Sequence, residues 1–92
     1  MNVTADADRD RLQQRLVRIE GQVRGVQRML DEGRDCREVI QQLAAVRAAV
    51  HQVGVEVMRT YAVQCLDAPE SETGRREALD YVIGTLGRWS ST

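Results

Sequence analysis

The sequence lacks phenylalanine and lysine, and its 92 residues include one tryptophan, two tyrosines and two cysteines. Two cysteines are too few for the disulfide framework of a small secreted domain. No apolar run approaches the roughly 20 residues of a membrane-spanning helix, and the polar N-terminus lacks the apolar segment of a secretory signal. We therefore expect a cytoplasmic protein that does not associate with membranes.

The scarcity of large aromatic side chains leaves little material for a hydrophobic core. A chain of this length is usually one domain, and a small domain buries a smaller fraction of its surface than a large one. We expect a single domain over residues 1–92 that completes its core by forming a homo-oligomer. With no nucleophile–base pair and no phosphate-binding loop in the sequence, we expect neither an enzyme nor a cofactor.

Apolar residues in the first third of the chain recur every three or four positions, which is the period of one helix face. They are Leu12, Leu16, Ile19, Val23, Val26 and Leu30. The pattern predicts a helix from about Asp8 to Asp31, followed by Gly33 just past its C-terminus. Gly21 and Gly25 either admit a second helix closely or are tolerated at some loss of helix stability.

A long second helix is predicted from Asp35 or Cys36 to about Leu66, with Asp35 and Glu38 resembling a capping box. Its apolar stripe comprises Cys36, Ile40, Leu43, Arg47, Val50, Gly54, Met58, Tyr61 and Cys65. At 1.5 Å per residue this helix spans ~45 Å. Such a length indicates that the helix is shared with a second protomer.

A short third helix is predicted from Glu72 to about Gly87, followed by a frayed tail over residues 88–92. The residues placed on one face are Leu79, Val82, Ile83 and Leu86. The predicted fold class is therefore all-α, with three helices in each protomer, the second of them long. An antiparallel dimer of this long helix is the arrangement that the two cysteines, considered below, would require in order to meet.

Arginines form a second stripe on the first helix, displaced by roughly 100° from the apolar one. Its members are Arg11, Arg15, Arg18 and Gln22. Between Arg11 and Arg28 the chain carries five arginines and one acid, although its net charge is −1. The stripe is either a phosphate-binding surface or a solvated helix face. Arg47 either extends its charge to solvent or joins the same basic surface in an oligomer.

Cys36 and Cys65 are 29 residues apart on one predicted helix. That spacing corresponds to ~44 Å, whereas a disulfide needs Cα atoms within ~7 Å. The two residues could meet only across a twofold axis between antiparallel helices that cross near Val50 and His51. Three chemistries remain open, namely a soft-metal site, reversible sulfur chemistry and inert core thiols.

The run Arg15-Leu16-Val17-Arg18-Ile19-Glu20-Gly21-Gln22-Val23-Arg24-Gly25, followed by Arg28-Met29-Leu30, closely resembles the signature of the CsoR/RcnR family of bacterial repressors. The later runs Asp35-Cys36, 39–47 and Cys65-Leu66 agree with it, and the similarity covers roughly residues 9–86. The resemblance implies a helical homodimer that pairs into a homotetramer and binds operator DNA without a helix-turn-helix. The resemblance places Arg15 and Arg18 on the first helix, which contacts DNA in this family. With the rest of the stripe and Arg47, the expected DNA-binding residues are Arg11, Arg15, Arg18, Gln22 and Arg47.

The resemblance also implies an inducer site between protomers, where copper sensors use Cys, His and Cys. This chain has Tyr61 in place of the histidine, and Asp35 and Tyr81 in place of the tyrosine and glutamate that support it. Retention of both cysteines resembles the persulfide-sensing branch, CstR. The resemblance thus implies that persulfide or polysulfide links Cys36 to Cys65 of the partner subunit through a di-, tri- or tetrasulfide. The alternative is a Cu(I)-responsive repressor that uses the two thiolates alone.

Overall fold

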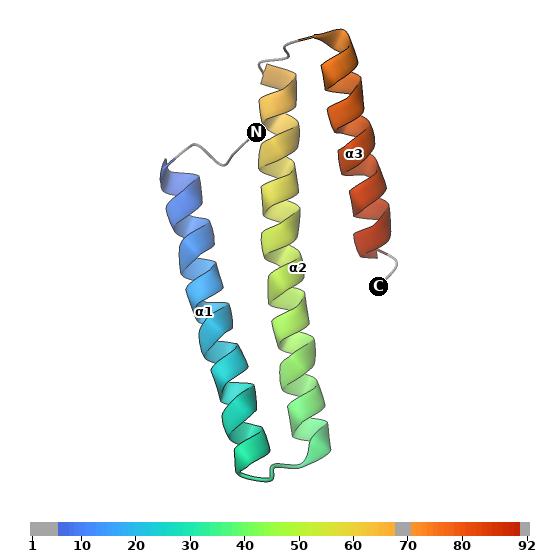
Figure 1. The fold of residues 1–92 in the computed structure, drawn as a ribbon. Helices are drawn as coiled ribbons and strands as arrows, with labels where there is room; N and C mark the ends of the chain where they lie inside the picture. The colour runs from blue at the N-terminus through green and yellow to red at the C-terminus, as the bar shows by residue number, and fades with distance from the viewer. Residues whose placement is uncertain (1–5, 68–70, 91–92) are drawn as a thin grey trace. The chain divides into compact units, whose positions relative to one another are not determined.

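The computed structural model describes residues 6–67 and 71–90, and the side chains of these residues other than 65–67 and 90. Three helices occur in this part of the chain, α1 (Asp6–Asp31), α2 (Cys36–Asp67) and α3 (Glu72–Ser90) (Figure 1). Because no strand accompanies them there, the all-α fold class is confirmed. No described helix combines the length and apolar character needed to cross a membrane.

The end of α1 forms around Gly33, as predicted. Gly33 has a φ of +67°, in the left-handed region that a residue without Cβ adopts readily. Its N–H donates to the Leu30 carbonyl at 3.2 Å, and the Arg34 N–H donates to the Met29 carbonyl at 2.9 Å. These two bonds make a Schellman motif, which satisfies carbonyls that the helix end would otherwise leave unpaired.

Side chains cap the N-termini of α2 and α3. Asp35 Oδ1 accepts a hydrogen bond from the Arg37 N–H at 3.1 Å, and Ser71 Oγ accepts one from the Gly74 N–H at 2.9 Å. The predicted cap at Asp35 is thus present. The Glu38 carboxylate, predicted to complete a capping box, instead accepts from Arg34 Nε at 2.8 Å.

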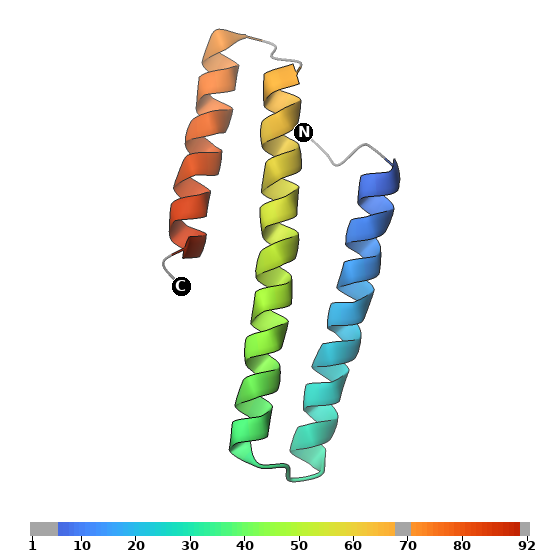
Figure 2. The ribbon, with the colours of Figure 1, turned by 180° about the vertical axis from the view of Figure 1, so that it is seen from behind.

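The chain divides into two compact units, Ala5–Val53 and Gly54–Thr92. In the first, α1 lies antiparallel to the N-terminal half of α2 (Figure 2). The residues buried in this unit are Leu12, Ile19, Val26, Val39 and Val53. The three on α1 are seven positions apart, so the two helices meet along a narrow seam. The predicted α1 stripe is accordingly only half buried, because every second member is exposed.

The predicted α2 stripe does not face α1. Ile40, Leu43, Arg47 and Val50 are exposed. The seam uses Val39, Val46 and Val53 instead, which lie roughly 80° round the helix from that stripe. One protomer therefore leaves the predicted stripe of this half of α2 uncovered.

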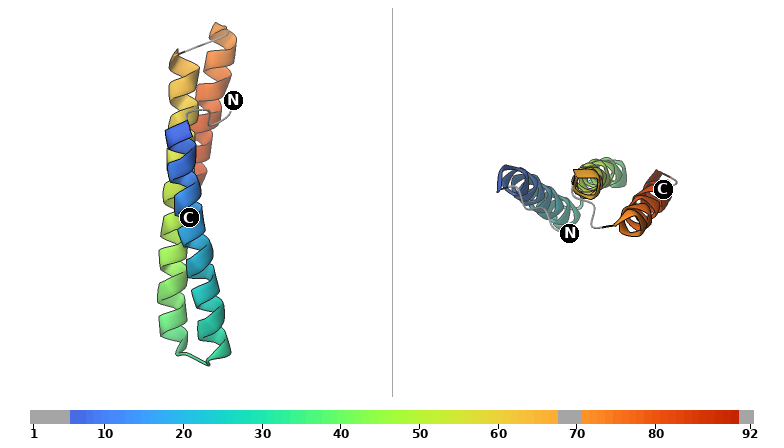
Figure 3. Two further views of the ribbon diagram at one scale, coloured as in Figure 1. Left: turned by 90° about the vertical axis from the view of Figure 1, so that its left-hand side faces the viewer. Right: turned by 90° about the horizontal axis from the view of Figure 1, so that it is seen from above.

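In the second unit, α3 runs antiparallel to the C-terminal half of α2 (Figure 3). Its buried residues are Met58, Ala78, Val82 and Thr85. The predicted frayed tail is wrong for residues 88–90, because α3 continues to Ser90 and the Trp89 indole packs on Gly54. Of the residues that the sequence places on one face of α3, Val82 is buried whereas Ile83 and Leu86 are exposed.

Candidate functional site

Part of the arginine stripe lines a groove between α1 and α2. Arg15, Arg18 and Gln22 contribute from α1, and the cavity has a volume of about 340 Å³. We call it the arginine groove, and its lining residues are Arg15, Arg18, Ile19, Gln22, Ala48, Ala49 and Gln52. All of these belong to the unit Ala5–Val53. The structure thus brings together three of the five predicted DNA-binding residues.

The sequence explains why a hollow forms here. Arg15, Arg18 and Gln22 follow one another by three and four positions, which places them along one edge of the buried seam of α1. On the facing edge of α2 the chain has Ala48 and Ala49, whose methyl groups fill little of the space between the helices. The guanidinium groups therefore border an open recess rather than a packed interface.

A second hollow adjoins the arginine groove toward the α1–α2 turn. It has a volume of about 370 Å³, and Gln22 lines both hollows. Its residues are Gln22, Gly25, Arg28, Met29, Glu32, Arg34 and Gln42. The hydrogen bond and the charge of Glu38 raise the pKa of Arg34, and Glu32 adds to this effect. Because Glu32 lines this hollow beside Arg28 and Arg34, the hollow is less suited to an anion.

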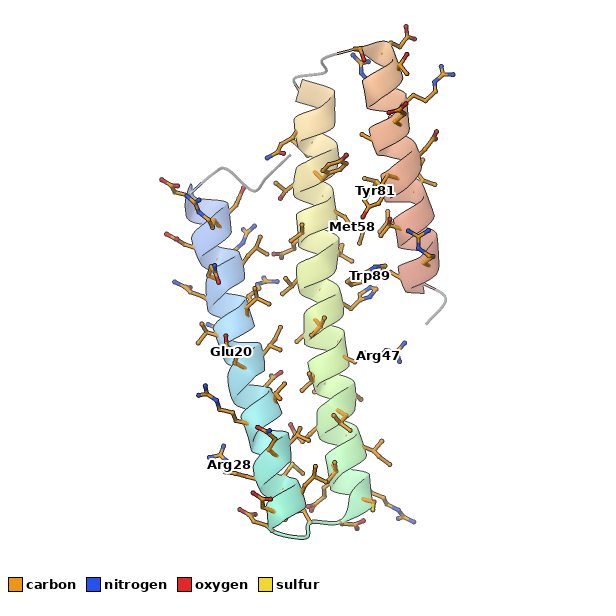
Figure 4. The ribbon with its side chains drawn as sticks, viewed as in Figure 1. Glu20, Arg28, Arg47, Met58, Tyr81 and Trp89 are labelled. Carbon is orange, nitrogen blue, oxygen red and sulfur yellow. The ribbon has the colours of Figure 1, made fainter. Side chains whose placement is uncertain are left out.

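Arg11 and Arg47 do not line the arginine groove. Arg11 lies one turn before Arg15 and forms an ion pair with Asp8 at 3.5 Å. Arg47 is exposed and points away from α1 (Figure 4). Within one protomer these two arginines are therefore not gathered with Arg15 and Arg18.

Cys36 is the first residue of α2 and has an exposed side chain. Because the thiol is exposed, the interpretation of Cys36 as an inert core residue does not hold for the protomer. Asp35, predicted to lie near the sensing site, caps the helix directly before it. Cys65 also belongs to α2, but its side chain lies outside the part of the chain that the structure describes.

Tyr61 and Tyr81, the other two residues predicted near the sensing site, contact one another. Their ring centroids are 6.1 Å apart and the ring planes are inclined by 65°. This edge-to-face geometry is favoured by the quadrupoles of aromatic rings. Tyr61 comes from α2 and Tyr81 from α3, so the pair joins the two helices of the second unit one turn before Cys65 in the sequence.

The described side chains do not assemble a metal site within one chain. Among them, no three His, Cys, Asp or Glu residues gather into a group that could hold a metal ion. Tyr61, which replaces the expected histidine ligand, contacts the Tyr81 ring. Among the described side chains of one protomer, the donors therefore do not form a three-coordinate metal centre.

The α2 side of the groove was not predicted from the sequence. Ala48, Ala49 and Gln52 are separated by one and three positions, the spacing of neighbours on one helix side. The available sequence signal was this pattern of two small residues and one polar residue. The apolar stripe and the cysteines of the same helix are more conspicuous, so the pattern was not recognised.

Known proteins resemble the chain along most of its length. The model of a family described as "Metal-sensitive transcriptional repressor" matches residues 8–88. The copper-sensing transcriptional repressor CsoR of Bacillus subtilis is 36% identical over 77 residues, which cover 83% of this chain and 76% of that protein. The transcriptional repressor RcnR of Salmonella typhimurium is 35% identical over 79 residues, which cover 86% of this chain and 88% of that protein.

A solved structure supports the same assignment. The nickel-responsive transcriptional regulator InrS superposes with a TM-score of 0.74 and 33% identity, covering 96% of this chain and 99% of that chain. Family match, curated relatives and structural likeness all agree with the signature over residues 15–25. The chain belongs to the CsoR/RcnR family of metal-sensitive transcriptional repressors.

Proposed function

We propose that this chain represses transcription by binding operator DNA and releases it when reactive sulfur species modify Cys36. The observation that carries the DNA-binding role is the arginine groove, where Arg15, Arg18 and Gln22 converge. Guanidinium groups bind phosphate through two parallel hydrogen bonds. The relatives named above are repressors, which supports a regulatory rather than an enzymatic role.

We propose that a second copy of the chain packs against an exposed apolar face of the first unit. The residues of this apolar face, all at least 40% exposed, are Leu16, Val23, Leu30, Ile40, Leu43 and Val50. On both helices they lie on the opposite side of the seam from the arginine groove, because a helix advances about 100° per residue. Pairing through this face leaves the arginine groove of each protomer open. Arg47 lies on the same side of α2 as the apolar face. We propose a homodimer, paired into a homotetramer, of single-domain protomers.

The proposed sensing chemistry begins at Cys36, whose thiol is exposed at the N-terminus of α2. The thiolate is the nucleophilic form of a cysteine. Attack of that thiolate on the outer sulfur of an organic persulfide forms Cys36–S–SH and releases the donor as a thiol. The Cys65 thiolate of the partner subunit then attacks Sγ of Cys36, which forms a disulfide between the two Sγ atoms and expels the added sulfur as hydrogen sulfide.

Longer bridges need only further sulfur transfer. Two cysteine persulfides condense to a trisulfide with loss of one hydrogen sulfide. A cysteine persulfide and a cysteine trisulfane condense to a tetrasulfide in the same way. No external oxidant is required, because the oxidising equivalents come from the sulfane sulfur of the persulfide. One such sulfur is reduced to hydrogen sulfide for each new sulfur–sulfur bond. The bridge must join two chains, since a continuous α2 separates the two cysteines of one chain.

Intact mass spectrometry tests the sensing chemistry. The wild-type chain treated with an organic persulfide should give covalent dimers that carry zero, one or two additional sulfurs in each of their two bridges. Cys36→Ser and Cys65→Ser should each abolish the covalent dimer, while a mixture of the two variants should restore a singly bridged one. A wild-type chain that remains monomeric in mass after this treatment contradicts the proposal.

A Cu(I)-responsive repressor is the second candidate, favoured by the 36% identity to the copper-sensing CsoR. In this case two thiolates, Cys36 and Cys65 of the partner subunit, would hold the ion without an imidazole. Titration against a Cu(I) chelator of high affinity separates the candidates. Stoichiometric binding that also weakens DNA binding selects copper, whereas failure to compete with the chelator selects sulfur.

DNA binding is tested with duplexes that the wild-type chain selects from a random-sequence pool. Affinity should fall steeply with salt, because each phosphate that the protein neutralises releases counterions. Arg18→Ala should weaken binding and reduce the slope of log K against log salt by about 0.9 for each phosphate that is no longer neutralised. Arg24→Ala, a matched arginine of α1 outside the groove, should change the slope less. If the wild-type chain selects no duplex, the proposed function fails.

A further inference from the structure

On the α2 side, the arginine groove is lined by two small residues and one amide, Ala48, Ala49 and Gln52. Ala48 and Ala49 leave a recess of about 340 Å³, much larger than the ~30 Å³ that a water molecule occupies. Ala48 is exposed, and Ala49 is half-buried at the edge of the seam. A longer side chain at position 48 would therefore fill the recess without entering the core.

The polar groups of the recess come from both helices. Arg15, Arg18 and Gln22 face Gln52 of α2, and the lining of this described cavity includes two guanidiniums, two carboxamides and no carboxylate. Guanidinium and carboxamide N–H groups are both donors to phosphate oxygens in protein–DNA complexes. The recess is thus bordered by donors on two sides.

The concave shape favours a phosphate group over a base edge. In duplex DNA the base edges are recessed in the grooves, so a protein reads them with side chains that protrude. Phosphate groups lie on the outside of the duplex and can enter a recess. The lining also contains no aromatic ring among its described residues, whereas sites for single-stranded nucleic acid stack bases on such rings.

We infer that Ala48, Ala49 and Gln52 of α2 complete a seat for one backbone phosphate of duplex DNA. The two alanines keep the seat open, and the Gln52 amide donates to the phosphate from the side opposite Arg15 and Arg18. The inference rests on the proposed DNA-binding function. It adds that α2 itself contacts the DNA through neutral residues.

Ala48→Leu tests the open recess without removing any charge. Leucine is a good helix former, and position 48 is exposed, so the helix should be retained. Filling the seat should lower the affinity for the wild-type-selected duplex at least tenfold. Ala44→Leu is the matched control, because Ala44 is an exposed alanine of the same helix that lines neither hollow. It should bind as the wild type does.

The role of Gln52 is tested by removing its N–H donor and by replacing its amide with a carboxylate. Gln52→Ala should weaken binding about tenfold, the order expected for loss of a hydrogen bond to a charged group. Gln52→Glu keeps the shape but places a carboxylate against the phosphate, and should weaken binding further. Gln41→Glu controls for the added charge, since Gln41 is an exposed amide of α2 outside the groove. Circular dichroism of each variant should match the wild type.

The outcomes separate this inference from the function on which it rests. If the wild type binds duplex and Arg18→Ala weakens it, but Ala48→Leu and Gln52→Glu bind normally, the seat is wrong and the function stands. If the wild type binds no duplex, both fail. Inorganic phosphate compared with chloride at equal ionic strength distinguishes the source. Selective competition by phosphate at millimolar concentration would show a site for the free ion rather than one built for the DNA backbone.

Discussion

The Trp89 indole lies directly over Gly54, so that a Cβ added to the glycine would come within 2.1 Å of the ring. The contact joins the last turns of α3 to the C-terminal half of α2. It explains why the helix continues to Ser90, where the sequence pattern predicted a frayed tail. It also gives Gly54 a role that its place in the predicted apolar stripe did not reveal.

Gly54→Ala should therefore destabilise the protein, because the overlap with Trp89 outweighs the gain in helix propensity. Overpacking costs about 1–3 kcal/mol, and replacing glycine by alanine inside a helix gains up to about 1 kcal/mol. In a Trp89→Leu background the same change should become stabilising. Urea unfolding of the wild type, the two single variants and the double variant measures the change in unfolding free energy in both backgrounds. A stabilising Gly54→Ala in the wild-type background would show that the indole moves aside freely.

The helices themselves could be predicted from the spacing of apolar residues and from the residues at their ends. Gly33, Asp35 and the periodicity of α1 report local interactions, and the structure confirms them. The burial of particular stripe members could not be predicted in the same way. Which face of α2 packs on α1 depends on the relative rotation of two helices, and several faces of α2 are apolar enough to serve.

The site shows the same division. The spacing of Arg15, Arg18 and Gln22 predicted a shared face on one helix. That α2 would oppose them with Ala48 and Gln52 depends on the register between the helices, which no local pattern specifies. The Tyr61–Tyr81 contact likewise required two helices to be placed together, although the resemblance to the family had marked both residues.

Gly33 and Gly21 should respond in opposite ways to alanine. Gly33→Ala places a Cβ in a left-handed conformation, at a cost of roughly 1–2 kcal/mol. Gly21→Ala meets nothing within 4 Å and should stabilise the isolated protomer by up to about 1 kcal/mol. Thermal unfolding at low protein concentration measures both. If Gly21→Ala is destabilising only at concentrations where the chain is oligomeric, a second copy approaches this glycine closely.

The Tyr61–Tyr81 pair should show a measurable coupling energy. Edge-to-face aromatic pairs contribute about 0.5–1.5 kcal/mol beyond the area they bury. In a double-mutant cycle, Tyr61→Leu and Tyr81→Leu should together cost less than the sum of the two single changes by that amount. Tyr61→Phe and Tyr81→Phe retain the rings and should preserve the coupling. A coupling below about 0.3 kcal/mol would indicate that the two rings act independently.

Ile40→Asp should separate the protomers without unfolding them. Ile40 is 64% exposed on the apolar face, so a carboxylate there is solvated in the single protomer but desolvated if a second copy covers the face. Val17→Asp is the matched control, since Val17 is 62% exposed on the side of α1 turned away from α2. Sedimentation velocity should show a smaller species for Ile40→Asp only, with unchanged helix content. An unchanged oligomer for Ile40→Asp would place the interface elsewhere, whereas an equal loss in both variants would point to general destabilisation rather than to this face.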